Sequence, residues 1–210
     1  MNFKLRILCS VLLVASVFSC TQQLAGNGSE ITNGYCVASA SAADSAMVVA
    51  YPNDYLPYPP SGKPETTFTD KNGHFALCLG RKGWNLVIYD RLQVFGAFVP
   101  LPRGDSAVDT IVLKHLGSVY GVANDTTADL RYIGILGSPF YAALTGKTDT
   151  FSLIKLPAYY YDLRKWRLTK SGESGATDFQ NISLRSSNNI TASATIRVVP
   201  DTTTNILIDP

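Results

Sequence analysis

The chain has little of what enzymes commonly use for chemistry. Of its 210 residues only 2 are histidine and 4 are cysteine, and 16% are Asp, Glu, Lys or Arg. His74 and His115 belong to no spacing of Cys or carboxylate residues that would form a metal site. The sequence has no Gly-x-Ser-x-Gly elbow and no phosphate-binding glycine loop after a strand. It therefore predicts no catalytic residue, no cofactor and no metal, and a protein that is not an enzyme.

Long apolar runs and long helix-forming stretches are also missing. No run reaches the roughly 18 apolar residues that a membrane-spanning helix needs. Thr, Ser, Gly, Val and Tyr are frequent, whereas stretches rich in Glu, Lys, Ala and Leu are absent. This composition favours an all-β protein.

Residues 1–19 have the features of an export signal. Lys4 and Arg6 precede an apolar stretch of about 12 residues, which is too short to span a bilayer. The stretch ends in Val17-Phe18-Ser19-Cys20, which resembles the lipobox of bacterial lipoproteins. The resemblance implies that Cys20 becomes the first mature residue and carries acyl chains. The alternative is ordinary secretion with Cys20 unmodified.

The residues after the cysteine indicate where such a lipoprotein would lie. Thr21 follows Cys20, instead of the Asp that commonly retains lipoproteins in the inner membrane. The resemblance therefore implies a lipid anchor in the bacterial cell envelope, at the outer membrane. Residues 20–32 are polar and small, without an apolar period, and predict a flexible tether.

The mature chain has no net charge. Loss of Lys4 and Arg6 leaves 16 basic residues against 16 acidic ones. A chain without a basic excess lacks the electrostatic footprint of a nucleic-acid-binding protein. Nucleic acid is therefore not an expected partner.

Two of the four cysteines are expected to stay in the folded part. Cys9 lies in the signal and Cys20 is the acylation site, which leaves Cys36 and Cys78. An exported protein meets an oxidising compartment, so these two thiols could form a disulfide. Two buried free thiols are the alternative. Leu77 and Leu79 should face the core, which would turn Cys78 outward.

Short apolar stretches at spacings of roughly ten residues predict two β-sandwich domains, 33–115 and 116–210. In the first domain we expect strands at 35–38, 47–51, 66–69, 74–79, 84–89, 94–99 and 108–113. In the second we expect them at 117–123, 130–135, 141–144, 151–156, 159–168, 181–184, 190–199 and 205–208. No linker separates the domains, which favours a fixed end-to-end arrangement.

The stretch 66–77 predicts a β-hairpin. Asn72-Gly73 is the favoured pair for a tight turn, because both central positions require positive φ. A weaker copy lies at 145–153, where Phe151 and Leu153 correspond to Phe75 and Leu77. The copy indicates a repeated β-domain in which Phe75 and Phe151 are equivalent buried anchors.

The turn and the strands around it resemble a known family. Thr69, Asp70, Asn72, Gly73, Phe75 and Leu77, with Leu156-Pro157-Ala158 in the second copy, resemble the carboxypeptidase regulatory-like domain. The resemblance implies antiparallel β-sandwiches of the Ig-like, prealbumin-like (transthyretin-like) type. It also implies accessory, adhesion or carbohydrate-associated modules, since such domains are rarely catalysts.

Residues 51–64 form the most suggestive surface feature. Tyr51, Tyr55 and Tyr58 lie among five prolines, and flat rings on a stiff loop could stack on sugars or hold a partner protein. The alternative is that these rings cap the open end of a sandwich.

Two functions therefore compete. The first is a non-catalytic lipoprotein that acts in adhesion, scaffolding or envelope-associated binding. The second is a carbohydrate-binding lipoprotein with Tyr51, Tyr55 and Tyr58 as its platform. The expected partners are the membrane, reached through the lipid, and either a glycan or an envelope protein.

Overall fold

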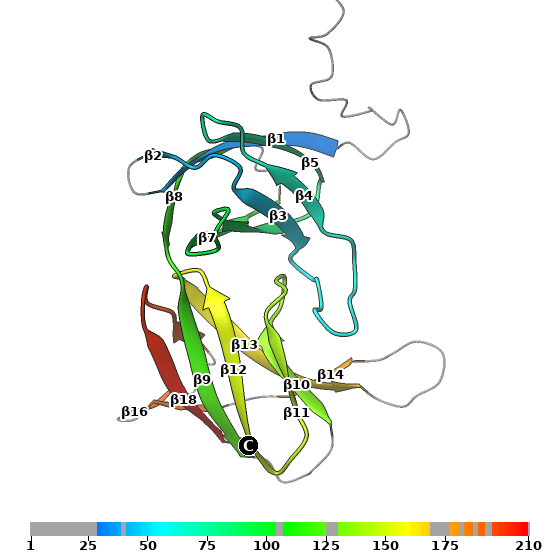
Figure 1. Cartoon of the computed structure of the whole chain (residues 1–210). Helices are drawn as coiled ribbons and strands as arrows, with labels where there is room; N and C mark the ends of the chain where they lie inside the picture. Colours follow the sequence, from blue (N-terminus) through cyan, green and yellow to red (C-terminus); the bar gives the residue numbers. More distant parts are fainter. Residues whose placement is uncertain are drawn as a thin grey trace, which may run out of the picture.

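The protein is all-β, as its composition predicts. The computed structural model describes residues 29–38, 41–103, 107–124, 130–168, 177–180, 183–186, 189–191 and 195–209, and within these ranges it contains strands and no helix. Figure 1 shows two groups of sheets stacked end to end, with β8 running into β9 at the junction. Only Leu116 lies between these two strands.

The first group of strands forms one sandwich. Its strands are β1 (Ser29–Ala38), β2 (Ser41–Ala42), β3 (Met47–Pro52), β4 (Glu65–Phe68), β5 (His74–Gly80), β6 (Trp84–Tyr89), β7 (Phe95–Leu101) and β8 (Ala107–His115). Hydrogen bonds connect them in the order β2-β1-β8-β7-β6-β3-β4, and β5 pairs with β1. The sheet folds over between β7 and β8, which share only two paired positions.

The second group repeats this plan in two sheets. Its strands are β9 (Gly117–Asn124), β10 (Arg131–Ile135), β11 (Tyr141–Leu144), β12 (Thr148–Leu156), β13 (Tyr160–Leu168), β14 (Thr177–Gln180), β15 (Ser183–Ser186), β16 (Asn189–Thr191), β17 (Thr195–Arg197) and β18 (Thr203–Asp209). One sheet has the order β11-β10-β13-β14, with β17 on β13. The other has the order β12-β9-β18-β15-β16.

The two sandwiches have the same connectivity. β3 lies between β4 and β6, and β10 lies between β11 and β13. β1 pairs antiparallel with β5 and parallel with β8, and β9 pairs antiparallel with β12 and parallel with β18. These two pairs are parallel, because the last strand of each sandwich returns beside its first strand in the same direction. The other described strand pairs are antiparallel, as predicted.

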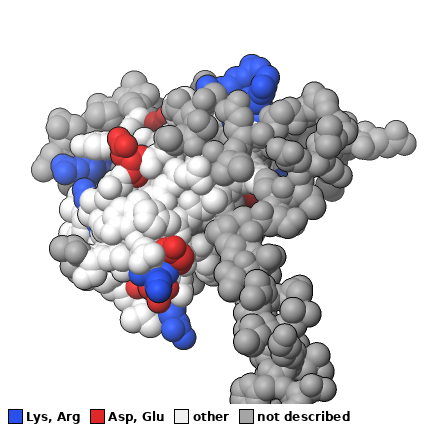
Figure 2. All heavy atoms as spheres, turned by 90° about the horizontal axis from the view of Figure 1, so that it is seen from above, with Lys and Arg blue, Asp and Glu red and all other residues white. Residues whose placement is uncertain are grey.

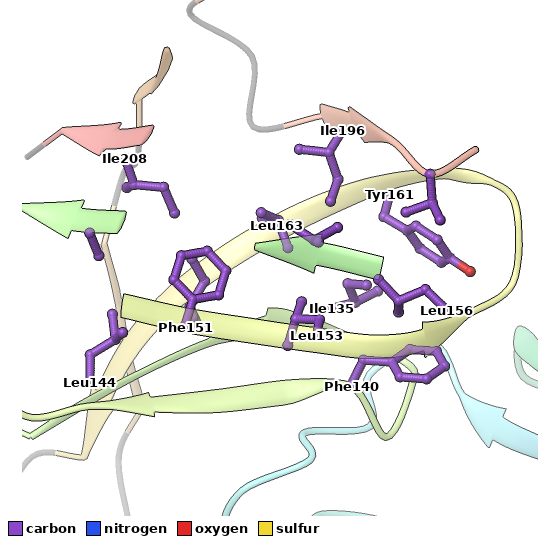
Figure 3. Packing of buried hydrophobic residues seen from close by; sticks show 14 of the residues in the cluster. Ile135, Phe140, Leu144, Phe151, Leu153, Leu156, Tyr161, Leu163, Ile196 and Ile208 are labelled. Carbon is purple, nitrogen blue, oxygen red and sulfur yellow. The ribbon is translucent and has the colours of Figure 1, made fainter. Parts of the chain in front are cut away.

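A buried apolar core fills each sandwich. Phe75, Leu77 and Leu79 alternate inward from β5, and Phe151 and Leu153 do so from β12. In Figure 3 Phe151 points into the space between the two sheets of the second sandwich, toward Leu163. Phe75 and Phe151 are both buried, as predicted, and each lies opposite a glycine of the first strand of its sandwich, as the repeat alignment requires. Truncation of a buried Phe to Ala typically costs about 3–5 kcal/mol, so each ring is a major anchor of its sandwich.

The first strand begins earlier than its sequence indicates. β1 starts at Ser29, so residues 29–32 of the expected tether are strand. The segment from Ser29 to Tyr35 pairs with β5 through backbone groups, which need no apolar side chains. Thr32 is buried although it is polar, and it interrupts the apolar alternation that would have indicated a strand.

The turn at Asn72-Gly73 does not close a hairpin within one sheet. β4 pairs with β3 and β5 pairs with β1, so the turn connects one sheet to the other. Gly73 has a φ of +82°, whereas Asn72 is not among the residues with positive φ. The amide of Gly73 donates to the Asp70 carbonyl over 2.9 Å, and the amides of Asn72 and His74 donate to the Asp70 carboxylate. Asp70 therefore organises a type I turn followed by a left-handed glycine, instead of a two-residue hairpin turn.

Candidate functional site

The two histidines lie in separate surroundings. His74 is exposed beside the ring of Tyr35, with 5.0 Å between the ring centroids. His115 lies at the junction of the sandwiches, where its Nδ1 is 3.2 Å from a carboxylate oxygen of Asp201. Within the described ranges no group of three or more His, Cys, Asp or Glu side chains could hold a metal ion.

Cys36 and Cys78 do not pair with each other. Cys36 is a buried free thiol of β1, and burial raises the pKa of this thiol to about 12. Cys78, which is not a free thiol, lies opposite Ile31, about 16 Å along the strand from Cys36 and on the other face. A disulfide requires Cα atoms within about 7 Å, so the pairing is geometrically excluded. The outward turn of Cys78 agrees with the alternation of β5.

The three loop tyrosines do not form an exposed platform. Tyr55 is 9% exposed and its ring centroid lies 5.0 Å from that of the half-buried Tyr51. Burial, and next the neighbouring Tyr55, raises the pKa of Tyr51 to about 12. Tyr58 keeps 39% exposure, but its ring packs on those of Tyr132 and Tyr141 of the second sandwich. The platform expected from Tyr51, Tyr55 and Tyr58 is therefore wrong.

The loop that carries these rings binds the second sandwich instead. The indole Nε1 of Trp166 donates to the Tyr58 carbonyl over 2.9 Å, and the amide of Gly137 donates to the Tyr55 carbonyl over 2.8 Å. Leu56 is buried in one apolar cluster with Tyr132 and Trp166. In Figure 1 the chain between β3 and β4 extends from the first sandwich toward β10.

The outer face of β6 and β7 supplies the rest of this contact. Val87 of β6 is 1% exposed and belongs to the apolar core of the second sandwich, together with Phe140. Phe98 of β7 packs against Tyr159 and Tyr161, with 5.0 Å between its ring centroid and each of theirs. We call the contact made by residues 51–58, β6 and β7 with the second sandwich the inter-sandwich contact.

Polar side chains in the inter-sandwich contact form hydrogen bonds with the opposite sandwich. The Asn85 amide nitrogen donates to the Gly137 carbonyl over 3.0 Å. The Tyr89 hydroxyl donates to the Lys155 carbonyl over 2.8 Å. Burial raises the pKa of Tyr89 and of Tyr161, because a phenolate would be poorly solvated there. The contact thus combines buried apolar side chains with hydrogen bonds between the two sandwiches.

Charged side chains are sparse and mixed on the surface. Figure 2 shows the face above the first sandwich, where in its described part Lys and Arg lie next to Asp and Glu among uncharged residues. No single sign of charge dominates this part of the face, in line with the 16 basic and 16 acidic residues that follow residue 19. Within the described ranges, no helix that could cross a membrane is found. Residues 1–19 and Cys20, the expected signal and lipidation site, lie outside the described residues.

The sequence drew attention to Tyr51, Tyr55 and Tyr58 but did not indicate which residues they contact. Trp84 is a core residue of the first sandwich, and its Nε1 donates to the Gly80 carbonyl. Trp166 is also buried, but on the outer face of its sheet, under the loop of the first sandwich. The signal that could have indicated this was the alternation of β13, in which Leu163 and Trp166 fall on opposite faces.

Comparison with protein-family models and with curated proteins found no match. Among solved structures, the chain is similar to a leucine-rich repeat protein from Bacteroides thetaiotaomicron, with 10% identity, 87% of this chain and 26% of that chain covered, and a TM-score of 0.33. It is also similar to the shaft pilin SpaA from Lactobacillus rhamnosus GG, with 10% identity, coverage of 87% and 98%, and a TM-score of 0.29. A DUF3823 family protein from Bacteroides ovatus shares 11% identity, with coverage of 85% and 98% and a TM-score of 0.31.

The chain spans about a quarter of the leucine-rich repeat protein. We draw no argument about family or function from similarities of this size. The resemblance of residues 69–77 to the carboxypeptidase regulatory-like domain therefore stays a prediction.

Proposed function

We propose that this protein is a non-catalytic lipoprotein of the bacterial cell envelope, in which two β-sandwiches form one stiff module for adhesion, scaffolding or envelope-associated binding. The apolar segment and lipobox-like sequence before Cys20 support the anchor. Thr21 supports the outer membrane as its location. The resemblance to carboxypeptidase regulatory-like domains supports an accessory role.

The inter-sandwich contact is the observation that carries the scaffold role. The sandwiches are joined through Leu116 on one side, and residues 55–58 bind the second sandwich elsewhere. Two separate attachments restrict both the tilt and the rotation of one sandwich against the other. Val87 is buried between them, so separation would expose apolar surface. Such a module can hold a binding surface at a fixed height above the membrane.

Lipid attachment can be tested by comparing three chains. The wild-type protein and Cys9→Ser should enter the detergent phase and incorporate a palmitate analogue. Cys20→Ser should remain in the aqueous phase, unlabelled. Cys9→Ser is the matched control, because Cys9 leaves with the signal segment. Equal partition of Cys20→Ser and the wild type would disprove the anchor.

The stiffness of the module needs a separate measurement. Spin labels at Phe68→Cys and Ile154→Cys, two exposed positions on β4 and β12, report the distance between the sandwiches. A single narrow distance distribution is expected. A broad distribution would show that the sandwiches move independently, which contradicts the scaffold role.

A further inference from the structure

A groove runs between two strands that separate from each other. β7 pairs with β6 from Gly96 to Leu101 but meets β8 only at Phe95↔His115 and Gly96↔Lys114. β8 pairs with β1 on its other side. From Ala97 onward, the facing edges of β7 and β8 have no ladder partner within the described ranges.

The groove is open, and apolar and polar side chains both line it. It has a volume of about 340 Å³, and its walls include Phe98, Val99, Val108 and Val112. Ala158 of the second sandwich also lines it, so the groove is continuous with the inter-sandwich contact made by Phe98. Val112 is 55% exposed, which is high for a valine in a strand.

The two strand edges differ in what they can bind. Pro100 lies in β7 and lacks an amide proton, so it cannot donate a backbone hydrogen bond to a strand added at that edge. β8 contains no proline. Free amides and carbonyls along such an edge can accept a further strand through backbone hydrogen bonds.

We propose that an extended segment of a different polypeptide adds as a strand to the free edge of β8, with its apolar side chains in this groove. The chemistry of the site requires an extended backbone, because an open groove beside a strand edge offers a ladder and not an enclosed cavity. The proposal names the class of partner that the proposed scaffold would hold, and it rests on the proposed scaffold role in that respect alone.

The charges beside the groove specify the segment further. Asp109 and Lys114 are exposed, line the groove and form no ion pair with any described residue. They are separated by about 16 Å along β8. A complementary segment therefore has a basic residue opposite Asp109, small apolar residues alternating in between, and an acidic residue near Lys114.

The test uses the full-length chain in detergent and a phage-displayed library of random 12-residue peptides. Selection should enrich proline-free peptides with alternating small apolar residues and a basic residue near one end. Binding of a selected peptide should weaken at least tenfold for Val112→Lys, which places a charge in the groove. The matched control Ile154→Lys, at another exposed apolar strand position, on β12, should change binding less than twofold. Both variants are checked for unchanged thermal unfolding.

Charge reversal and hydrogen exchange locate the binding site. Asp109→Lys should weaken a peptide with a basic end at least threefold, and less so at high salt. Amides of 108–112 that do not bond to β1 should exchange rapidly in the free protein and at least tenfold more slowly with peptide. No enrichment, protection elsewhere, or a dimer that Val112→Lys dissociates would each overturn the proposal. None of these outcomes depends on Cys20, so failure here is distinguishable from failure of the anchor.

Discussion

The ring of Phe151 lies across the backbone of Gly121 on the neighbouring strand. The two residues are directly paired in the β12–β9 ladder, and a Cβ atom at Gly121 would overlap the ring. Gly34 and Phe75 repeat this arrangement in the β1–β5 ladder of the first sandwich. The pairing explains why a small residue recurs at this place in each first strand: the glycine leaves room for the ring to turn into the core.

This relationship predicts that Gly121→Ala destabilises the second sandwich. The added methyl group must displace the Phe151 ring, and overpacking of this kind typically costs about 1–3 kcal/mol. In a Phe151→Leu background the same change should cost much less, because the ring is absent. Denaturant unfolding measures both values, and equal costs in the two backgrounds would contradict the ring contact. Gly80→Ala is the control, since a Cβ there meets nothing within 4 Å.

The turn at Gly73 gives a second prediction. Gly73→Ala must adopt a φ of +82° and also places a methyl group against the Cys36 carbonyl and 2.9 Å from the Tyr35 ring. The left-handed conformation alone costs roughly 1–2 kcal/mol, so the total loss should exceed it. Gly62→Ala separates the two effects, because Gly62 has a φ of +76° and faces only the Pro52 side chain, at 3.3 Å. Equal losses for both variants, measured by thermal unfolding, would show that the contact with Cys36 is not tight.

The Asp70 carboxylate predicts how stability changes in acid. Its backbone hydrogen bond from His74, and next that from Asn72, lowers the pKa of Asp70 below its usual value. A group with a lowered folded-state pKa stabilises the fold above its unfolded pKa, about 3.9 for Asp, and this stabilisation is lost as the pH falls through the folded pKa. In Asp70→Asn, the free energy of unfolding of the first sandwich should therefore fall less steeply with decreasing pH in the acid range than it does in the wild type. A carbon-13 titration of Asp70 with a midpoint at or above the unfolded value would contradict this.

The repeat and the strands of the cores could be predicted from sequence because alternation determines which side chains turn inward. Strands such as 84–89 and 141–144 were predicted with the bounds that the structure has. Alternation fails where backbone pairing alone holds a strand, as at Ser29–Tyr35.

Contacts between the sandwiches were beyond sequence reasoning for a different reason. An aromatic side chain on a loop has the same local pattern whether it faces solvent or another sandwich. Tyr55 and Tyr58 are therefore indistinguishable in sequence from a ligand platform. Only the placement of Gly137 and Trp166, which are far along the chain, shows that the loop is an internal contact.

The inter-sandwich contact predicts coupled unfolding. Val87→Ala removes two buried methyl groups and should cost about 2 kcal/mol. Val112→Ala, at an exposed position of β8, should change stability by less than about 0.5 kcal/mol. Backbone amide signals of β1 and β5 report on the first sandwich and those of β9 and β18 on the second, so NMR in denaturant can follow each one. Their transitions should coincide in the wild type and separate in Val87→Ala. Coincident transitions in both proteins would mean that Val87 does not couple the sandwiches.

Phe151→Ala tests how far this coupling extends. The loss of about 3–5 kcal/mol is a large part of the ~5–10 kcal/mol available to a domain, so the second sandwich should lose most of its hydrogen-exchange protection. Val87 and Phe98 then lose their partners, so β6 and β7 of the first sandwich should exchange faster than in the wild type. β1 and β5, which contribute nothing to the contact described above, should keep their protection. Phe75→Ala should give the converse, with the strands β9, β12 and β18 retained. Unchanged exchange in β6 and β7 of Phe151→Ala would show that the contact adds no stability, and loss of protection in every strand would show a single cooperative unit.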